Sequence, residues 1–208
     1  MGKVITGLSM SLDGFIAGPN DGPERPLGDG GERILAWYFS GDTDWVLPSG
    51  TMTFKVSPAS AELLQEVQRT IGAFVTGRRT FDIANAWGGR HPLGVPVFVV
   101  THTVPQEWVY EGSPFTFVTD GVQSAVEKAK KVAGDKGVAV GAASIVQQCI
   151  RVGLLEEIHI DLVPVLLGGR CPTVRSLGHG ADRAGEHEGD RGRWGHAPYL
   201  PCRKGELT

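Results

Sequence analysis

The sequence predicts an α/β domain with a largely parallel central sheet, and three observations lead to this fold class. Apolar runs of strand length alternate with stretches in which apolar residues recur at helical spacing. Several runs end in glycine or small polar residues, which is typical of tight strand-to-helix turns. Residues 138–169 show the whole pattern: an apolar run, a turn at Gly141, a helical segment closed by Gly153, and a second apolar run.

Length and composition predict a globular protein of one domain, or of one domain with appendages. The 208 residues are 41% hydrophobic and 21% charged, close to the globular average, so a core can form. The formal net charge is −3, and acidic and basic residues are interspersed along the chain, so neither nucleic acid nor a membrane is expected as a partner. No run reaches the ~18 apolar residues of a membrane span, and no secretory signal is recognisable, so a cytoplasmic protein is expected. Three scattered cysteines predict no metal site.

The first elements in chain order are a strand and a short helix joined by a long loop. Residues 3–8 alternate and then become apolar, which predicts a strand. Residues 18–31 are rich in Gly, Pro and Asp and are expected to form a loop. Residues 34–39 favour a short helix, and residues 40–56 are expected to be loop.

A well-marked helix and a buried strand follow. Ser57 and Pro58 open the helix, because serine caps a helix and proline fits its first turn. Residues 71–76 are apolar throughout and predict a buried strand. Four further apolar runs predict strands at residues 95–101, 115–119, 138–140 and 158–167. An amphipathic helix is expected over residues 122–132.

Two arginines stand where the strand 71–76 ends. Gly77, Arg78 and Arg79 make a strand–glycine–helix junction, and guanidinium groups bind phosphate as a fork of donors. The alternative is two solvated arginines, although the helix dipole disfavours cations at a helix start. That local cost favours a ligand role.

Polar or glycine-rich residues follow three of the predicted strands. These strand ends are Thr76-Gly77-Arg78, Thr101-His102 and Gly141-Ala142-Ala143-Ser144. Ligands of parallel sheets bind at the carboxyl ends of strands, and helix N-termini favour phosphate. The sequence therefore predicts a nucleotide cofactor site at this edge of the sheet.

Three motifs carry a family resemblance over residues 3–169. They are Ser11-Leu12-Asp13-Gly14-Phe15-Ile16-Ala17, Val75-Thr76-Gly77-Arg78-Arg79-Thr80-Phe81, and the stretch from Leu154 to Gly169 with Pro164-Val165-Leu166-Leu167-Gly168-Gly169. They resemble the dihydrofolate reductase-like superfamily, closest to the C-terminal reductase domain of riboflavin biosynthesis enzymes (RibD) and its stand-alone bacterial relatives. The resemblance implies a three-layer α/β/α fold with a mostly parallel sheet, and residues 1–169 as an NADPH-binding reductase domain.

The resemblance also implies NADPH as the hydride donor and assigns residues to it. The residues expected to hold its phosphates are Gly77, Arg78, Arg79 and Thr80. Those expected near the adenosine ribose and its 2′-phosphate are Thr101 and His102. Those expected to receive the pyrophosphate are Gly141, Ala142, Ala143 and Ser144, where the family often has consecutive glycines. Those expected to border the nicotinamide are Ile16 and Ala17.

The expected activity is that of a 5-amino-6-(5-phosphoribosylamino)uracil reductase. Dihydrofolate reductases proper carry a carboxylate on the first helix before a Leu-Ala-Trp-Phe-like run. Here Ile34 precedes the matching run, which argues against folate. Asp13 is the candidate for proton handling, with a plain turn residue as the alternative.

The sequence leaves two other functions open. One is a reductase of this superfamily acting on another small heterocycle or carbonyl. The other is a nucleotide-binding protein without turnover. The expected partner is a small-molecule substrate, and because relatives are often dimers, a homodimer is a further expectation.

Residues 170–208 differ in composition from the rest of the chain. They contain few large aliphatic residues and many Gly, Arg, Asp, Glu and His, which predicts a disordered or poorly packed tail. The family continues here with Arg-Leu-Phe-Asp and closing antiparallel strands. Reading back-translated codons from their second base permits Ala-Arg-Leu-Phe-Asp and later strand-like sequence. A frame shift is therefore a second hypothesis, and the closing strands are expected to be missing in either case.

Overall fold

The computed structural model of the chain describes residues 2–50 and 52–168. The expectations for residues 170–208, disorder or a frame shift, lie outside the described residues. So does the expectation that closing strands are missing, although no strand follows β8 within the described part of the chain.

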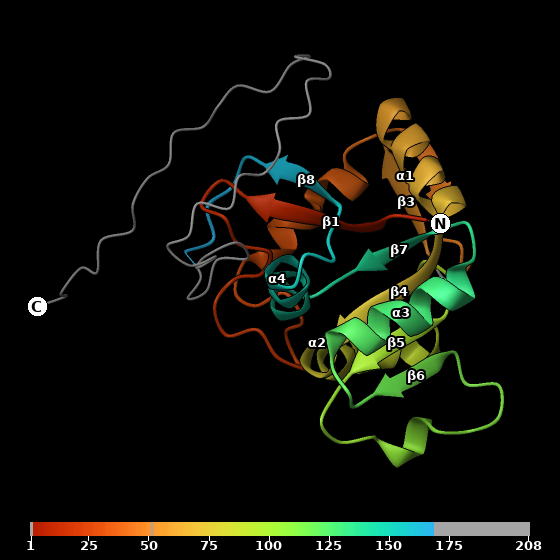
Figure 1. The fold of residues 1–208 in the computed structure, drawn as a ribbon. Coiled ribbons are helices and arrows are strands. Elements are labelled where there is room, and N and C mark those ends of the chain that lie inside the picture. The colour runs from red at the N-terminus through yellow and green to blue at the C-terminus, as the bar shows by residue number, and fades with distance from the viewer. Residues whose placement is uncertain (1, 51, 169–208) are drawn as a thin grey trace, which may run out of the picture. The chain divides into compact units, whose positions relative to one another are not determined.

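Six strands form one sheet in which every neighbouring pair is parallel. Their order is β6-β5-β4-β7-β1-β8 (Figure 1). Their bounds are Val4–Ser11 (β1), Ile71–Gly77 (β4), Val97–Val100 (β5), Phe115–Val118 (β6), Gly137–Val140 (β7) and Glu157–Val163 (β8). This sheet and its covering helices confirm the predicted three-layer fold.

The helices of the described residues begin and end largely where the sequence predicts. Their bounds are Pro58–Thr70 (α1), Arg78–Ile83 (α2), Val122–Ala133 (α3) and Ala143–Arg151 (α4), with 3-10 helices at Gly31–Phe39 (η1), Asn85–Gly89 (η2) and Gln106–Trp108 (η3). Ser57 caps α1 by accepting a hydrogen bond from the Ser60 N–H at 3.1 Å. Gly153 follows α4 with a φ of 67°, which favours glycine. None of the described helices is long and apolar enough to cross a bilayer.

Alternate residues of the central strands enter cores on opposite faces of the sheet. Val75 and Phe98 pack with α3 and α4, which lie together in front of the sheet in Figure 1. Phe74 and Val97 point the other way and pack with Phe81 of α2. The sheet is therefore buried on both sides, which is why its strands read as continuous apolar runs.

One prediction for the N-terminal half is wrong. Residues 40–56, expected to be loop, contain the antiparallel hairpin of β2 (Thr43–Val46) and β3 (Thr53–Val56). Trp45 and Val56 are buried against Ala61 of α1. Packing against that helix stabilises two strands that are too short to show a period in the sequence.

Candidate cofactor site

A cavity of about 880 Å³ opens at the carboxyl ends of the parallel strands. The loops that follow β1, β4, β5, β6 and β7 supply its lining. The predicted cofactor residues that line it are Ile16, Ala17, Gly77, Arg78, Arg79, Thr80, Thr101, His102, Ala142, Ala143 and Ser144. The structure thus brings together residues from four separate segments, while Gly141 and Asp13 do not line the cavity.

Gly77 lies where the two glycine-containing turns meet. A Cβ at this position would lie 3.2 Å from Ile145 Cγ1 and 3.7 Å from Ser144 Oγ. The start of α2 therefore approaches the start of α4 closely, and a larger residue would push them apart. This approach places the arginines after β4 beside the turn after β7.

Gly141 serves the packing of the sheet. A Cβ at Gly141 would collide with the ring of Phe74, which packs on the neighbouring strand β4. The position needs glycine for that reason, and it does not border the cavity. Of the four residues expected to receive the pyrophosphate, Ala142, Ala143 and Ser144 line the cavity and Gly141 does not.

The N-terminus of α4 presents backbone donors to the cavity. Ala142 has φ 74° and ψ 128° and precedes the helix without a side-chain cap. The N–H groups of Ile145 and Val146 bond to the Ala142 carbonyl at 3.1 and 3.0 Å. The N–H groups of Ala143 and Ser144 donate to no acceptor among the described residues. Two free N–H groups at a helix N-terminus favour an anion such as phosphate.

Arg78 and Arg79 both make ion pairs at the edge of the cavity. Arg78 donates from Nε to Asp82 and from Nη1 to the Thr103 carbonyl, each at 2.7 Å. Arg79 Nη2 reaches across to the loop after β1 and donates to the Asp21 carboxylate at 2.7 Å. Arg78 is thus fixed by its own helix and by the β5 turn, whereas Arg79 connects two walls of the cavity.

Thr101 and His102 differ in what their side chains can reach. Thr101 is buried, and its hydroxyl donates to the Thr103 carbonyl at 2.8 Å and accepts from the Thr103 N–H at 3.2 Å. This hydroxyl therefore shapes the turn after β5. His102 is exposed at the cavity and can meet a ligand directly.

Asp13 anchors the loop after β1. Its carboxylate accepts hydrogen bonds from the Ser11 hydroxyl at 2.5 Å and from the N–H groups of Gly168 at 2.8 Å and Leu167 at 3.2 Å. Burial of the carboxyl favours its neutral form, but these hydrogen bonds outweigh that effect and lower the pKa of Asp13. The carboxylate is therefore ionised at neutral pH and anchors this loop, and the proton-handling role expected from the sequence stays a prediction.

The sequence did not identify one wall of the cavity. This wall is the loop after β1, and its residues beyond Ile16 and Ala17 are Phe15, Gly18, Pro19, Asn20, Asp21, Pro26 and Leu27. The Gly18 N–H donates to the Leu27 carbonyl at 2.8 Å, which closes the loop on itself. Its glycines and prolines predict a loop, but they carry no signal for the contact between Asp21 and Arg79.

Comparisons with known proteins show what this chain is similar to. Residues 2–182 match the sequence model of a family described as the RibD C-terminal domain. Uncharacterized protein YyaP of Bacillus subtilis strain 168 is 24% identical over 182 residues, which are 82% of this chain and 79% of that protein. A crystal structure of a putative riboflavin biosynthesis protein from Shewanella sp. PV-4 has a TM-score of 0.56 at 21% identity and covers 82% of both chains. Dihydrofolate reductase from Enterococcus faecalis, complexed with NADP(H) and RAB-propyl, has a TM-score of 0.44 at 16% identity and covers 83% of this chain and 77% of that chain.

Proposed function

Because the chain belongs to the RibD C-terminal domain family, we propose that it is an NADPH-dependent reductase of a phosphoribosylaminopyrimidine. The substrate meant is 5-amino-6-(5-phosphoribosylamino)uracil or a close analogue, whose ribose is reduced to ribityl. One observation carries the proposal: all but one of the residues expected to bind NADPH line a single cavity at the carboxyl edge of the sheet.

NADPH would supply the hydride, and the residues of the chain would bind and orient it. The free N–H groups of Ala143 and Ser144 fit a pyrophosphate, and the guanidinium of Arg79 fits a phosphate as a bidentate donor. Ile16 and Ala17 offer a small apolar surface to the nicotinamide.

The ion pair between Arg79 and Asp21 does not prevent this binding. The side chain of Arg79 is 68% exposed, and exposed ion pairs contribute only about 0.2–1 kcal/mol. A hydrogen bond to a charged group contributes about 1.5–3 kcal/mol, so a cofactor phosphate can replace the aspartate. Arg79 would then exchange one anion for another, while Arg78 stays tied to Asp82.

Ile34 excludes folate less firmly than the sequence suggests. The comparison with dihydrofolate reductases requires residues 34–39 to be the first helix, with Ile34 in place of a carboxylate. In the structure this segment is the 3-10 helix η1, and the first α-helix is α1. Dihydrofolate should therefore be tested as a substrate together with the aminopyrimidine.

Titration of the purified chain with NADPH and NADH, followed by nicotinamide fluorescence, tests the cofactor. We expect NADPH to bind, and Arg79→Ala to raise its Kd by about 10- to 100-fold, the equivalent of one charged hydrogen bond. Arg69→Ala is the matched control, because Arg69 is an exposed arginine on α1 outside the cavity. Absence of NADPH binding, or equal Kd values for the wild type and Arg79→Ala, would contradict the proposal.

Oxidation of NADPH in the presence of each substrate then separates the functions. Turnover with the aminopyrimidine and none with dihydrofolate supports the proposed substrate. Turnover only with another heterocycle or carbonyl compound would support a reductase activity but contradict the proposed substrate. Binding of NADPH without oxidation by any of them favours a nucleotide-binding protein without turnover.

A further inference from the structure

Part of the central sheet is open on one face. Gly7 lies in the middle of β1, which is an interior strand between β7 and β8, and yet Gly7 is exposed. Apart from its chain neighbours, no described atom lies within 4 Å of the position that a Cβ at Gly7 would occupy. Interior strands of parallel sheets are normally covered on both faces. The open surface at Gly7 therefore leaves room for a ligand.

A carboxylate and two aromatic rings lie beside this open surface. Ser9, two residues beyond Gly7, is in register with Asp161 of β8. Because side chains alternate along a strand and residues in register share a face, all three point the same way. Trp37 Nε1 donates to the Ser9 hydroxyl at 3.0 Å, so η1 lies over this face. The ring of Tyr38 stacks on that of Trp37 at a centroid distance of 3.8 Å.

Asp161 lacks a hydrogen-bond donor. Its half-buried carboxylate accepts no hydrogen bond from the part of the chain that the structure describes. Burial raises the pKa of this carboxyl, and the neighbouring His159 offsets that effect only in part. Burial, and then the charge of Asp161, raise the pKa of Tyr38 to about 12, so the carboxylate lies close to η1. A ligand that brings N–H donors would remove the unfavourable free energy of this unpaired group.

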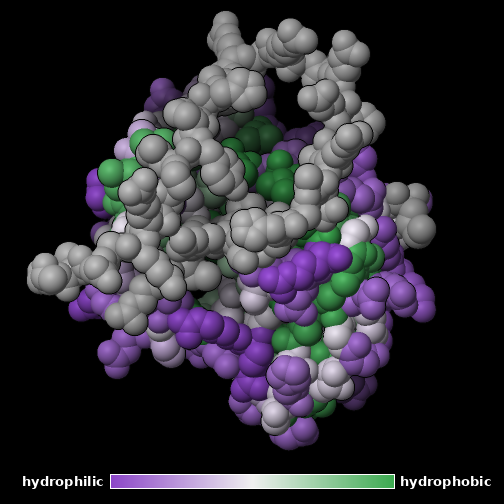
Figure 2. Space-filling view, turned by 60° about the vertical axis from the view of Figure 1, so that its left-hand side comes forward, coloured by the Kyte–Doolittle hydropathy of each residue, from purple (hydrophilic) through white to green (hydrophobic). Residues whose placement is uncertain are grey.

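The open surface lies at the same edge of the sheet as the candidate cofactor site. β1 ends at Ser11, which is two residues or about 7 Å of strand beyond Ser9. The loop that follows carries Ile16 and Ala17 to the cavity. Figure 2 brings this edge forward and shows hydrophobic surface among hydrophilic side chains, a mixture that suits a heterocycle. A ligand at Asp161 is thus close to the loop where the nicotinamide is expected.

We propose that Asp161 binds the substrate ring and selects a 2-amino-4-oxopyrimidine over a uracil, an inference that rests on the proposed function. A carboxylate only accepts hydrogen bonds, so its two oxygens match two adjacent donors. The 2-amino group and the neighbouring ring N–H form such a pair. Uracil has a carbonyl in place of the amino group, and this carbonyl would face a carboxylate oxygen. Trp37 and Tyr38 offer the ring an apolar flank.

A pair of substrates that differ only at C2 tests the selection. They are 2,5-diamino-6-(5-phosphoribosylamino)pyrimidin-4-one and 5-amino-6-(5-phosphoribosylamino)uracil. We expect kcat/KM to be about tenfold higher or more for the 2-amino compound, the equivalent of one charged hydrogen bond. Asp161→Asn should reverse the preference, because an amide presents one donor and one acceptor, which match the carbonyl and N–H of uracil. A wild-type preference for uracil, or a preference that Asp161→Asn leaves unchanged, would overturn the proposal.

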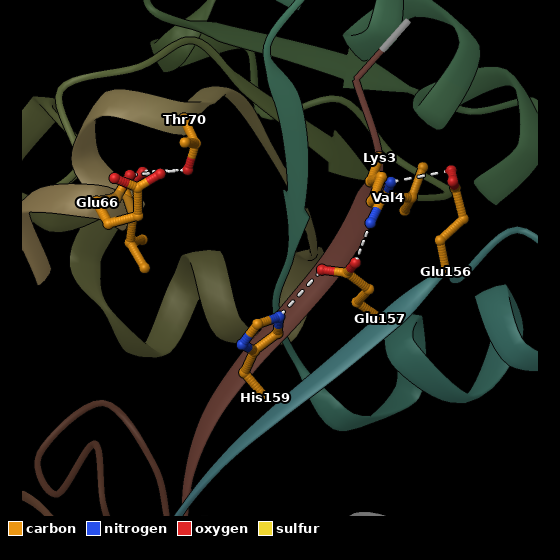
Figure 3. A network of polar contacts seen from close by, with 8 residues as sticks. Lys3, Val4, Glu66, Thr70, Glu156, Glu157 and His159 are labelled. Carbon is orange, nitrogen blue, oxygen red and sulfur yellow. Dashed lines mark hydrogen bonds and ion pairs between the residues drawn. The ribbon is translucent and has the colours of Figure 1, made fainter. Parts of the chain in front are cut away.

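Glu157→Gln is the matched control. Glu157 lies on the same face of β8, where its carboxylate pairs with Lys3 and lies 3.2 Å from His159 Nε2 (Figure 3). Four residues, or about 13 Å of strand, separate it from Asp161. This change of a carboxylate to an amide should therefore leave the preference between the two pyrimidines as in the wild type. An equal shift in both variants would indicate a general effect of charge and contradict recognition by Asp161.

Binding of the free bases separates this inference from the proposed function. Isocytosine and uracil carry the same two edges and require neither NADPH nor turnover. In NMR titrations of the full chain without cofactor, we expect isocytosine to bind more tightly than uracil and Asp161→Asn to reverse that order. This pattern in a chain that does not bind NADPH would contradict the reductase and support the ring site.

The opposite outcome is equally informative. Oxidation of NADPH with an aminopyrimidine, together with equal affinity for the two bases or binding of neither, would support the reductase and overturn recognition by Asp161. An Asp161 carboxylate already engaged by another segment of the chain would give this second result.

Discussion

The backbone at Ala142 is strained. A φ of 74° with a ψ of 128° is a conformation that glycine adopts readily and alanine does not. A residue in such a conformation lowers the stability of the fold by of order 1–3 kcal/mol, and strained residues are often found at ligand sites. The strain lies beside the free N–H groups of α4, where an anion would bind.

Ala142→Gly should stabilise the chain by about 1 kcal/mol, because relief of strain exceeds the entropy that glycine loses on folding. Urea unfolding measures the change. Ala143→Gly is the control, since Ala143 begins α4 with helical geometry and should lose about 0.5–1 kcal/mol. A shift of the same sign in both variants would argue against strain at Ala142.

His91 is a buried histidine held between aromatic rings. Its ring stacks on Phe74 at a centroid distance of 4.2 Å and meets Trp87 edge-on at 4.6 Å. The Nδ1 atom accepts a hydrogen bond from the Leu93 N–H at 3.2 Å. Burial lowers the pKa of His91 to about 4, so the ring is neutral in the folded protein at neutral pH.

This histidine predicts a loss of stability on mild acidification. Unfolded histidine has a pKa of about 6.5, so the unfolded state binds the proton first as the pH falls. The neutral His91 ring therefore contributes fully to the free energy of unfolding above about pH 6.5, and this contribution is lost as the pH falls toward about 4. The free energy of unfolding should fall by about 2 kcal/mol between pH 7 and pH 5 for this reason. His91→Phe should remove this slope in urea unfolding. The exposed His102 provides the control: His102→Phe should keep the slope, and a slope unchanged in His91→Phe would contradict the assignment.

At the scale of elements, the loop after β1 is held in place by Asp13. The carboxylate connects this loop to residues 167 and 168, just beyond β8. The loop carries Ile16 and Ala17 to the cavity, so Asp13 positions part of the wall without touching it. The residue is a positioning group in this arrangement.

Asp13→Ala should loosen that connection and lower the free energy of unfolding by about 1 kcal/mol, because backbone N–H groups lose a charged acceptor. Amide hydrogen exchange at Leu167 and Gly168 should accelerate, and the Kd for NADPH should rise. Asp42→Ala is the control, because Asp42 is exposed and, among the described residues, accepts a hydrogen bond only from the neighbouring Thr43 hydroxyl at 3.4 Å. Loss of turnover in Asp13→Asn with unchanged exchange and unchanged Kd would instead support proton transfer by Asp13.

The elements that the sequence predicts well have strong local signals. α1 has its cap at Ser57, and β4 is a long apolar run. The hairpin of β2 and β3 lacks such signals, because it is stabilised by Trp45 packing on α1. β1 runs to Ser11, three residues beyond its apolar part, because pairing with β8 continues to Val163.

At the scale of the whole molecule, the position of the cavity can be predicted from the residues that end the strands, without knowledge of side-chain contacts. Parallel topology brings those ends to one edge, so turn residues sufficed to find Gly77, Thr101 and Ser144. Contacts between loops cannot be predicted in this way, because neither the spacing of residues nor composition indicates that Asp21 contacts Arg79. The same holds for Gly141, whose need for glycine comes from a ring on a neighbouring strand.

The position of β1 in the sheet bears on the order of folding. β1 lies between β7 and β8, so Val4 pairs with Val138, and Ser11 pairs with Val163. The strand that is synthesised first therefore cannot pair until β7 and β8 have been synthesised. By contrast, β4, β5, β6 and α3 are close in sequence and can assemble earlier. The nascent chain thus carries an apolar strand without neighbours for most of its synthesis, and the rate of folding depends on closing this one long loop.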